Sequence, residues 1–142
     1  RPHILTSQDD GLGFWLNPKT PTVILSADCL DGHFAWANDS NFSGMGERFL
    51  TLDNRGTAAH WSSSGLGFTF EHTILHREFY EALFNEDYRT IGDAINFAKV
   101  NYLALGMDES EVYAFVLQGD PALDLYWAGL ENQYLPFVQK GS

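Results

Sequence analysis

The fold class of this chain is indicated most clearly by residues 22–32, which have the sequence TVILSADCLDG. Residues 22–27 form a short apolar run, rich in β-branched side chains, without alternation between polar and apolar positions. A strand covered on both faces has this pattern, and such strands are typical of parallel sheets in α/β proteins. Gly32 then permits a sharp turn. We therefore expect a buried strand at 22–27 that leads directly to Cys29.

Strands and helices alternate along the rest of the chain, and this order is typical of a mostly parallel sheet covered by helices. Residues 1–21 are rich in turn formers, with one possible helical turn at 6–12, and residues 126–142 form an aromatic tail. Between them we expect a short helix within 40–53 that Ser43 could cap, a strand at Thr57–Ser62, helices at Glu71–Asn85 and at Ile91–Leu105, the second capped by Thr90, and a strand at Val112–Leu117.

Composition indicates a single folded domain over residues 1–142 and excludes several partners. Hydrophobic residues make up 44% and aromatic residues 15% of the chain, so a packed core is expected. Lys and Arg total 8 against 19 Asp and Glu, for a formal net charge of -11. A nucleic acid or an anionic membrane surface requires a basic face, and the sequence shows none. No stretch is long and apolar enough for a membrane span.

Cys29 is the single cysteine, so neither an intrachain disulfide nor a Cys-based zinc site can form. A lone cysteine is most often a small buried side chain. However, catalytic residues of open α/β sheets collect at the carboxyl ends of strands, which is where Cys29 is expected. Asp28 and Asp31 flank the sulfur and would oppose a thiolate if they were close, and a histidine would counter them.

Four segments resemble gingipain-like cysteine peptidases, in the family's order. Residues 26–34 resemble the nucleophile motif, in which a hydrophobic strand is followed by Cys, two variable residues, Gly, one residue and an aromatic. Residues 4–7 resemble the stretch before the nucleophile strand, and 56–67 resemble a strand and loop that form one wall of the substrate cleft. Residues 119–123, with the sequence GDPAL, resemble the family's closing motif.

The resemblance implies a caspase-like fold, a three-layer α/β/α sandwich, of which this chain would be the C-terminal part with about three mostly parallel strands. It implies that Cys29 attacks a peptide carbonyl and forms an acyl-enzyme, with no cofactor and no metal. A secreted or periplasmic location is suggested by the family alone. Gly32 would belong to the turn that positions the nucleophile, and the expected substrate-binding residues are Gly32, His33, Trp61, Ser62 and Ser63.

The sequence departs from the family at the catalytic histidine, which the family carries in a Gly-His-Gly-like segment upstream of the nucleophile strand. His3 is the only histidine before that strand, and it lies too near residues 4–7 to match. We therefore expect the base to come from outside this chain, from a missing segment or a companion chain, and we expect the chain to associate with a companion chain or as a homo-oligomer. The alternatives are a non-catalytic assembly module that pairs through an exposed strand edge, and a truncated product without function.

The remaining histidines have less specific settings. His33 could line the cleft or belong to an ordinary surface. His60 and Trp61 are neighbours on a strand, so one would point into the core and the other out, unless Trp61 shapes a pocket. His72 and His76 are spaced i,i+4 on a helix, but no third ligand accompanies them. For these two histidines we expect a solvated face.

Overall fold

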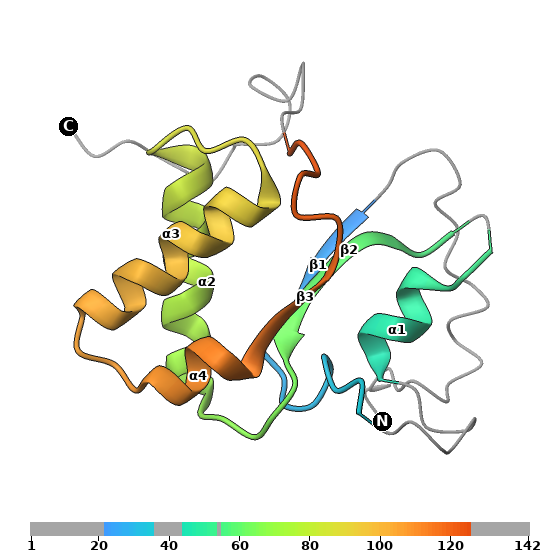
Figure 1. Cartoon of the computed structure of the whole chain (residues 1–142), viewed down its shortest axis with the longest axis horizontal. Coiled ribbons are helices and arrows are strands. Elements are labelled where there is room, and N and C mark those ends of the chain that lie inside the picture. Colours follow the sequence, from blue (N-terminus) through green and yellow to red (C-terminus); the bar gives the residue numbers. More distant parts are fainter. Residues whose placement is uncertain (1–21, 36–43, 54, 126–142) are drawn as a thin grey trace, which may run out of the picture.

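The computed structural model describes residues 22–35, 44–53 and 55–125, and shows three layers. A sheet lies between helix α1 on one side and helices α2, α3 and α4 on the other (Figure 1). This arrangement confirms the α/β fold class and is consistent with a partial caspase-like sandwich. The elements in chain order are β1 (Thr22–Leu25), α1 (Met45–Leu50), β2 (Thr57–Ser63), α2 (Thr69–Phe84), α3 (Ile91–Ala104), α4 (Glu109–Ala114) and β3 (Phe115–Gly119).

The sheet has the strand order β1-β2-β3 and is mixed. β1 runs parallel to β2, with Leu25 opposite Trp61, whereas β3 runs antiparallel to β2, with Leu117 opposite Trp61. The expectation of parallel pairing is therefore met by one of these two strand pairs. Because β1 and β2 are parallel, their carboxyl ends lie at the same edge of the sheet, where catalytic loops of α/β proteins converge.

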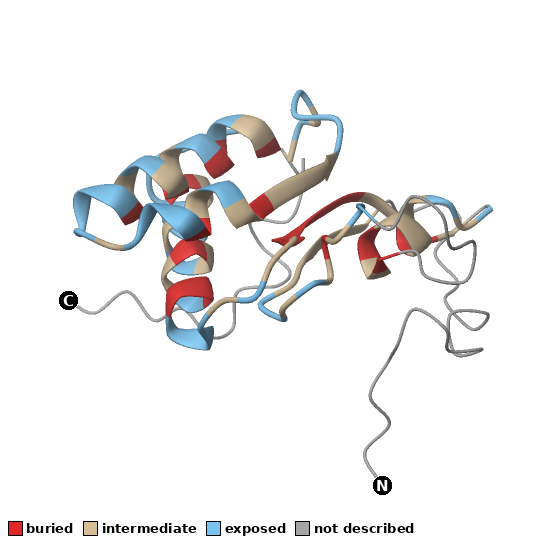
Figure 2. Cartoon of the chain, turned by 60° about the horizontal axis from the view of Figure 1, so that its bottom comes forward, coloured by how far each residue is buried: buried red, intermediate tan, exposed pale blue. Residues whose placement is uncertain are grey.

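The main core fills the space between the sheet and the pair α2 and α3. Trp61 lies at its centre, with its ring centroid 5.4 Å from that of Phe79 and 5.3 Å from that of Phe115. The buried apolar residues of the two helices, red in Figure 2, belong to the same cluster as buried residues of β2 and β3. Close packing of this kind supplies most of the stability of such helices. The other buried apolar residues of this cluster are Ala59, Leu75, Ala82, Ile91, Ala94, Ile95, Ala98 and Tyr102.

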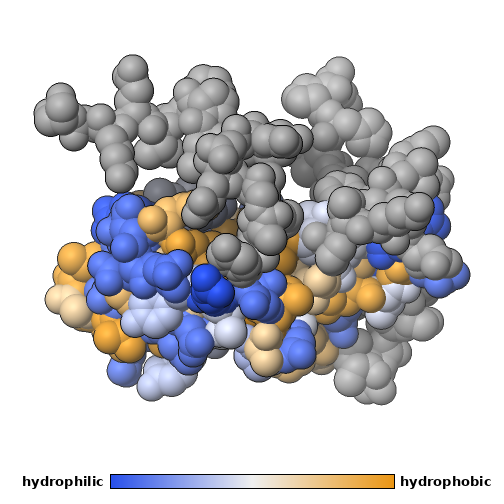
Figure 3. Space-filling model, turned by 90° about the horizontal axis from the view of Figure 1, so that it is seen from above, coloured by the Kyte–Doolittle hydropathy of each residue, from blue (hydrophilic) through white to orange (hydrophobic). Residues whose placement is uncertain are grey.

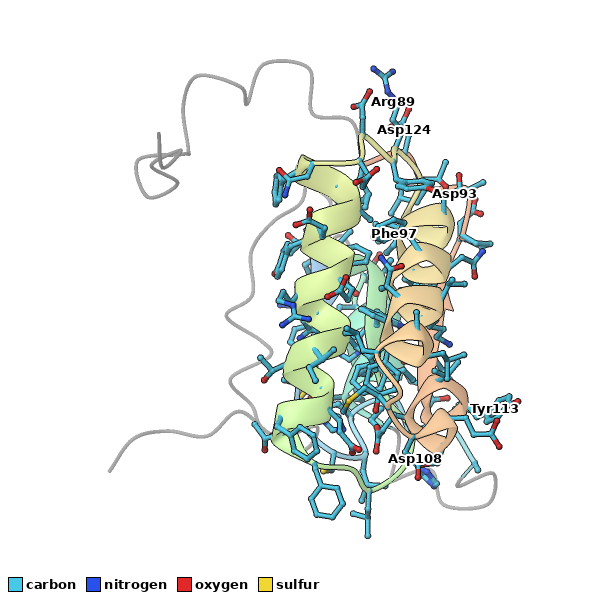
Figure 4. All side chains as sticks on the ribbon, turned by 90° about the vertical axis from the view of Figure 1, so that its left-hand side faces the viewer. Arg89, Asp93, Phe97, Asp108, Tyr113 and Asp124 are labelled. Carbon is cyan, nitrogen blue, oxygen red and sulfur yellow. The ribbon has the colours of Figure 1, made fainter. Side chains whose placement is uncertain are left out.

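The start of α3 agrees with the sequence prediction. Thr90 is the N-cap, and its hydroxyl accepts a hydrogen bond from the backbone N–H of Asp93 at 3.2 Å. Figure 4 shows Asp93 at the end of the helical layer where Arg89 and Asp124 lie, and Asp108 at the opposite end. The chain therefore crosses the full length of the layer between Asp93 and Asp108.

The predicted third strand was wrong at its start. Val112 lies in α4, and the strand begins only at Phe115. Asp108 caps this short helix by accepting from the N–H of Ser110, and Glu109 and Glu111 in the first turn favour its positive end. The predictions for residues 1–21, for the cap Ser43 and for the tail at 126–142 lie outside the described residues.

The surface mixes apolar and polar side chains. Figure 3 shows hydrophilic and hydrophobic residues next to each other over the helical layer. Tyr80 and Phe84 on α2 are exposed and stack on each other, with ring centroids 6.1 Å apart. Over the part of the chain that the structure describes, no helix has the length and apolar character needed to span a bilayer.

Candidate active site

Cys29 lies in the loop that follows β1, at the carboxyl end of the sheet, and its side chain is half-buried. Although β1 ends at Leu25, the loop continues alongside β2 and the segment after it. The backbone N–H of Ser26 donates to Trp61 O at 3.0 Å, that of Leu30 to Gly65 O at 3.1 Å, and that of Gly32 to Ser63 O at 2.9 Å. These bonds fix the path of the chain on both sides of the sulfur.

The turn directly after Cys29 has an unusual backbone. Leu30 has a φ of 66°, in the left-handed region, which costs a non-glycine residue about 1–2 kcal/mol. Its N–H and carbonyl are both used, because the N–H of His33 donates to Leu30 O at 3.0 Å. The Sγ of Cys29 donates to the carbonyl of Gly67 at 3.5 Å. The sulfur is therefore held between two loops, one after β1 and one after β2.

The two flanking carboxylates have partners other than the sulfur. Asp28 Oδ1 accepts from the N–H of Cys29 at 3.1 Å, and Asp31 Oδ2 accepts from Ser26 Oγ at 2.5 Å. Asp31 therefore closes the turn on its strand side. This hydrogen bond of Asp31 goes to Ser26 and does not involve Cys29.

Gly32 is buried where the loop crosses the sheet. A Cβ on Gly32 would lie 2.8 Å from Ser62 Oγ, 2.9 Å from Ser62 O and 3.1 Å from a methyl group of Val116. Gln118 Nε2 donates to the carbonyl of Gly32 at 3.4 Å. The position requires glycine for space, since no other residue fits between the turn and the strands without displacement. Contact between Gly32 and a substrate stays a prediction.

His33 is the half-buried member of the expected substrate-binding set, and its Nδ1 lies 3.0 Å from the carbonyl of Ser64. Because a carbonyl oxygen only accepts, Nδ1 carries the proton in this contact. The imidazole thus joins the loop after Cys29 to the loop after β2. A role in lining the substrate site is compatible with this exposure.

The three β2 residues of that set, Trp61, Ser62 and Ser63, are fully buried. Trp61 packs in the main core, while His60 points to the opposite face, where its ring stacks on Phe49 at 6.5 Å. Ser62 Oγ bonds to His60 Nδ1 at 2.9 Å, on the face covered by α1. Both neighbours on the strand are buried, because helices cover both faces of β2. Substrate contact by Trp61, Ser62 and Ser63 stays a prediction.

Several exposed side chains near Cys29 are apolar, and the sequence analysis missed them. Leu66 and Phe68 flank Gly67 and are 80% and 69% exposed, and Phe68 packs against Phe70 at 6.2 Å. Leu30 on the facing loop is also exposed. The available signal was the presence of large apolar residues in a glycine-rich loop between a strand and a helix, where polar residues are the norm.

The prediction of a solvated face for His72 and His76 was wrong. His72 is fully buried, with Nδ1 at 2.7 Å from Ala27 O and Nε2 at 3.3 Å from Glu111 Oε2. The reason is that α2 starts at Thr69, which brings residue 72 beneath the Cys29 loop. His76 lies one turn on, 5.5 Å from the Trp61 ring and 5.8 Å from the Phe115 ring. Burial, with a smaller effect of His72, lowers the pKa of His76 to about 4.

The sulfur of Cys29 is half-buried in the loop that follows β1, near the edge of the sheet where catalytic residues of α/β proteins collect. Its role as a nucleophile stays a prediction. The described ranges contain no group of three or more His, Cys, Asp or Glu side chains that could hold a metal ion.

Comparison with known proteins agrees with this geometry. The model of peptidase family C25 matches residues 3–126. The chain therefore belongs to this family, the gingipain family of cysteine peptidases, which confirms the resemblance of the nucleophile motif and identifies its substrates as proteins or peptides. No curated protein and no solved structure matches the chain.

Proposed function

We propose that Cys29 is the nucleophile of a cysteine endopeptidase and that the base histidine comes from outside this chain. The observation that carries the proposal is the position of Sγ, half-buried at the carboxyl end of β1 in a chain of the cysteine peptidase family. The thiolate attacks the carbonyl carbon of a peptide bond, and the C–N bond breaks as the amine takes a proton from the base. Water then hydrolyses the thioester.

The contacts of the sulfur support an external base. Within the described residues, the hydrogen bond of Sγ goes to the carbonyl of Gly67, which cannot take up a proton. Two histidines of the neighbouring segments have other partners: His33 Nδ1 bonds to Ser64 O, and His72 bonds through Nδ1 to Ala27 O and faces Glu111 through Nε2. A catalytic base must come within hydrogen-bond reach of the thiol, and these geometries direct His33 and His72 to other partners.

The oxyanion of the tetrahedral intermediate needs N–H donors close to the sulfur. The N–H groups of Leu30, Gly32 and His33 are used within the loop itself. The N–H of Cys29 is held by the exposed carboxylate of Asp28, which an incoming carbonyl oxygen can displace. We infer that the N–H of Cys29 itself serves as an oxyanion donor.

The proposed substrate wall has His33 at its surface, with Gly32, Trp61, Ser62 and Ser63 behind it. Their burial means that the last four act by holding the loops in place, so their substitution changes the site through its shape. The peptide would lie across the end of the sheet, beside the loop after β1 and the loop after β2, which are joined by the hydrogen bond from the N–H of Leu30 to Gly65 O.

The alternative function is that of an assembly module. β1 is paired with β2 on one edge, and among the described residues no strand pairs with its other edge. An unpaired edge is a ready template for another chain, whether a second copy or a companion that brings the missing base. Analytical ultracentrifugation distinguishes a monomer from a chain paired with a second copy or with a companion chain. A monomer at micromolar concentration that binds no companion chain would exclude edge pairing.

The proposed function is tested by peptide hydrolysis with the isolated chain and with Cys29→Ala. We expect little or no turnover by the isolated chain, because the base is supplied from outside. Turnover of a peptide library that equals that of active cysteine peptidases, and that is abolished in Cys29→Ala, would contradict an external base. Turnover that persists in Cys29→Ala would exclude Cys29 as the nucleophile.

A further inference from the structure

A buried histidine–carboxylate pair lies beneath the loop of Cys29 and is not used in the proposed chemistry. His72 is on α2 and Glu111 is on α4, and their side chains are 0% and 5% exposed. Figure 1 places α4 and the loop after β1 at the same end of the molecule. Long polar side chains are rarely buried to this extent unless they are paired, so the position of the pair requires a reason.

The protons of the pair can be assigned from its acceptors. The carbonyl of Ala27, 2.7 Å from Nδ1, only accepts, so Nδ1 carries a proton. Nε2 lies 3.3 Å from Glu111 Oε2, which is an ion-pair contact when the ring is protonated. A proton held between the ring and the carboxylate would make the pair neutral as a whole and would reduce the cost of its burial. Burial raises the pKa of Glu111, and His72 partly offsets this effect.

Two contacts connect this pair to Cys29. The first is the carbonyl of Ala27, two residues before the cysteine in the chain. The second is Gly67, whose carbonyl accepts from Cys29 Sγ and whose Cα leaves no room for a Cβ against His72 Nε2 and Glu111. Ala27, just before Cys29, and Gly67, on the loop opposite, therefore both pack against the His72–Glu111 pair.

We propose that His72 and Glu111 are positioning residues that hold Cys29 in place through Ala27 and Gly67. His72 is not a catalytic residue, because it is fully buried, its Nδ1 bonds to the carbonyl of Ala27, and its Nε2 faces Glu111 Oε2 at 3.3 Å. The contact with Ala27 acts directly on the nucleophile loop, while the contact with Glu111 orients the imidazole for that bond. The relevance of this positioning to catalysis rests on the proposed function of Cys29. The contacts of His72 and Glu111 do not depend on that function.

The test is the rate at which iodoacetamide alkylates Cys29 in the folded chain, followed by intact mass. The amide nitrogen of Asn lies close to the place of Nδ1, so His72→Asn keeps the donor to Ala27. The amide nitrogen of Gln lies close to the place of Nε2, so His72→Gln keeps only the contact with Glu111. The matched control is His76→Asn, one turn further along α2, where the ring packs on Trp61 and Phe115 without touching the loop.

We expect His72→Gln to release the thiol and to speed alkylation by about threefold to tenfold, as the loss of one hydrogen bond implies, and His72→Asn to stay within about twofold of the native rate. His76→Asn should lower stability without changing the rate in the folded protein. Equal rates for the Asn and Gln variants, whether native or accelerated, would overturn the proposal. Alkylation needs neither base nor peptide, so this result is independent of whether the chain is a peptidase.

A measurement on the native chain covers the case in which these variants do not fold. In a long-range proton–nitrogen NMR spectrum of the histidine rings, His72 should retain a proton on Nδ1 that exchanges slowly with water, because the ring is buried and bonded to Ala27 O. An Nδ1 proton of His72 that exchanges as fast as that of an exposed histidine would overturn the proposal.

Discussion

His72 and Ala27 are 45 residues apart in the sequence and are joined by a hydrogen bond of 2.7 Å from the imidazole to the carbonyl. This bond connects the first turn of α2 to the chain segment that carries Cys29. Because the imidazole is buried, water cannot replace the bond if it breaks, and the loop would lose a fixed anchor. The loop of Cys29 is therefore held by the helical layer as well as by its own strand.

We predict that Gly32→Ala destabilises the protein by about 1–3 kcal/mol, the usual cost of overpacking. The new Cβ would meet Ser62 Oγ, Ser62 O and Val116 at 2.8–3.1 Å, and backbone atoms cannot move aside. Urea denaturation measures the change. Gly65→Ala is the matched control, since its Cβ would lie 3.7 Å from that of Ala114 and should cost little. Equal stability of the two variants would contradict the packing described for Gly32.

Gly67→Ala should both destabilise the protein and loosen Cys29. Its Cβ would collide with His72 Nε2 and Glu111 Oε1, so either the ion pair or the Gly67 carbonyl must move. We expect a loss of about 1–3 kcal/mol. Alkylation of Cys29 should become faster than in Gly65→Ala. A stable Gly67→Ala with native alkylation would show that Gly67 does not link the pair to the sulfur.

Stability should fall as the pH decreases from about 6.5 towards 4, because of His76. Its pKa is lowered from 6.5 to about 4 in the folded chain, so in this window the unfolded chain binds a proton that the folded chain does not. After allowance for solvent near a partly exposed ring, we expect a loss of about 1–2 kcal/mol. Burial of His60 lowers its pKa and acts in the same direction.

His76→Phe checks this origin, because it keeps an aromatic ring against Trp61 and Phe115 and removes the titrating group. The free energy of unfolding, measured in urea at pH 7 and at pH 5, should depend less on pH in this variant than in the native chain. An unchanged difference between the two pH values would assign the effect to other groups.

Thr90→Ala should cost about 1 kcal/mol, the usual value of an N-cap hydroxyl. Thr90 Oγ1 accepts from the N–H of Asp93 and donates to its carboxylate at 2.7 Å. Thr73→Ala is the control, since Thr73 is exposed within α2 and its hydroxyl only bonds back to Thr69 O, where Ala is a better helix former. Thermal unfolding of both variants measures the difference, and equal melting temperatures would argue against the cap.

The sequence predicted the elements whose signals are local. The apolar run before Cys29 identified β1, although the strand ends at Leu25 and its residues are only partly buried, and the Thr90 cap identified the start of α3. The strand that was placed at Val112–Leu117 failed at its start, because apolar and β-branched residues there suggested β structure while the cap at Asp108 and the acidic first turn favour a helix.

The buried pair could not be predicted from sequence. His72 and Glu111 are far apart in the chain, and each is a polar residue of a type common on solvent-exposed helix faces. Only the packing of α2 and α4 against the loop after β1 brings them together and excludes water. Cys29 and Gly32 could be placed on the turn after β1 from the sequence, because the motif has fixed spacing, and their roles in catalysis stay predictions. The apolar surface at Leu66 and Phe68 has no such spacing.

The most direct test of the central claim is acylation of Cys29 by a peptide thioester in the presence of imidazole, which replaces the external base in solution. The chain and Cys29→Ala are incubated with the thioester, and intact mass followed by peptide mapping locates the acyl group. We predict an acyl-enzyme on Cys29 that forms faster with imidazole and faster in the folded chain than in urea. Acylation that is as fast in the unfolded chain, or absent from Cys29, would contradict its assignment as a positioned nucleophile.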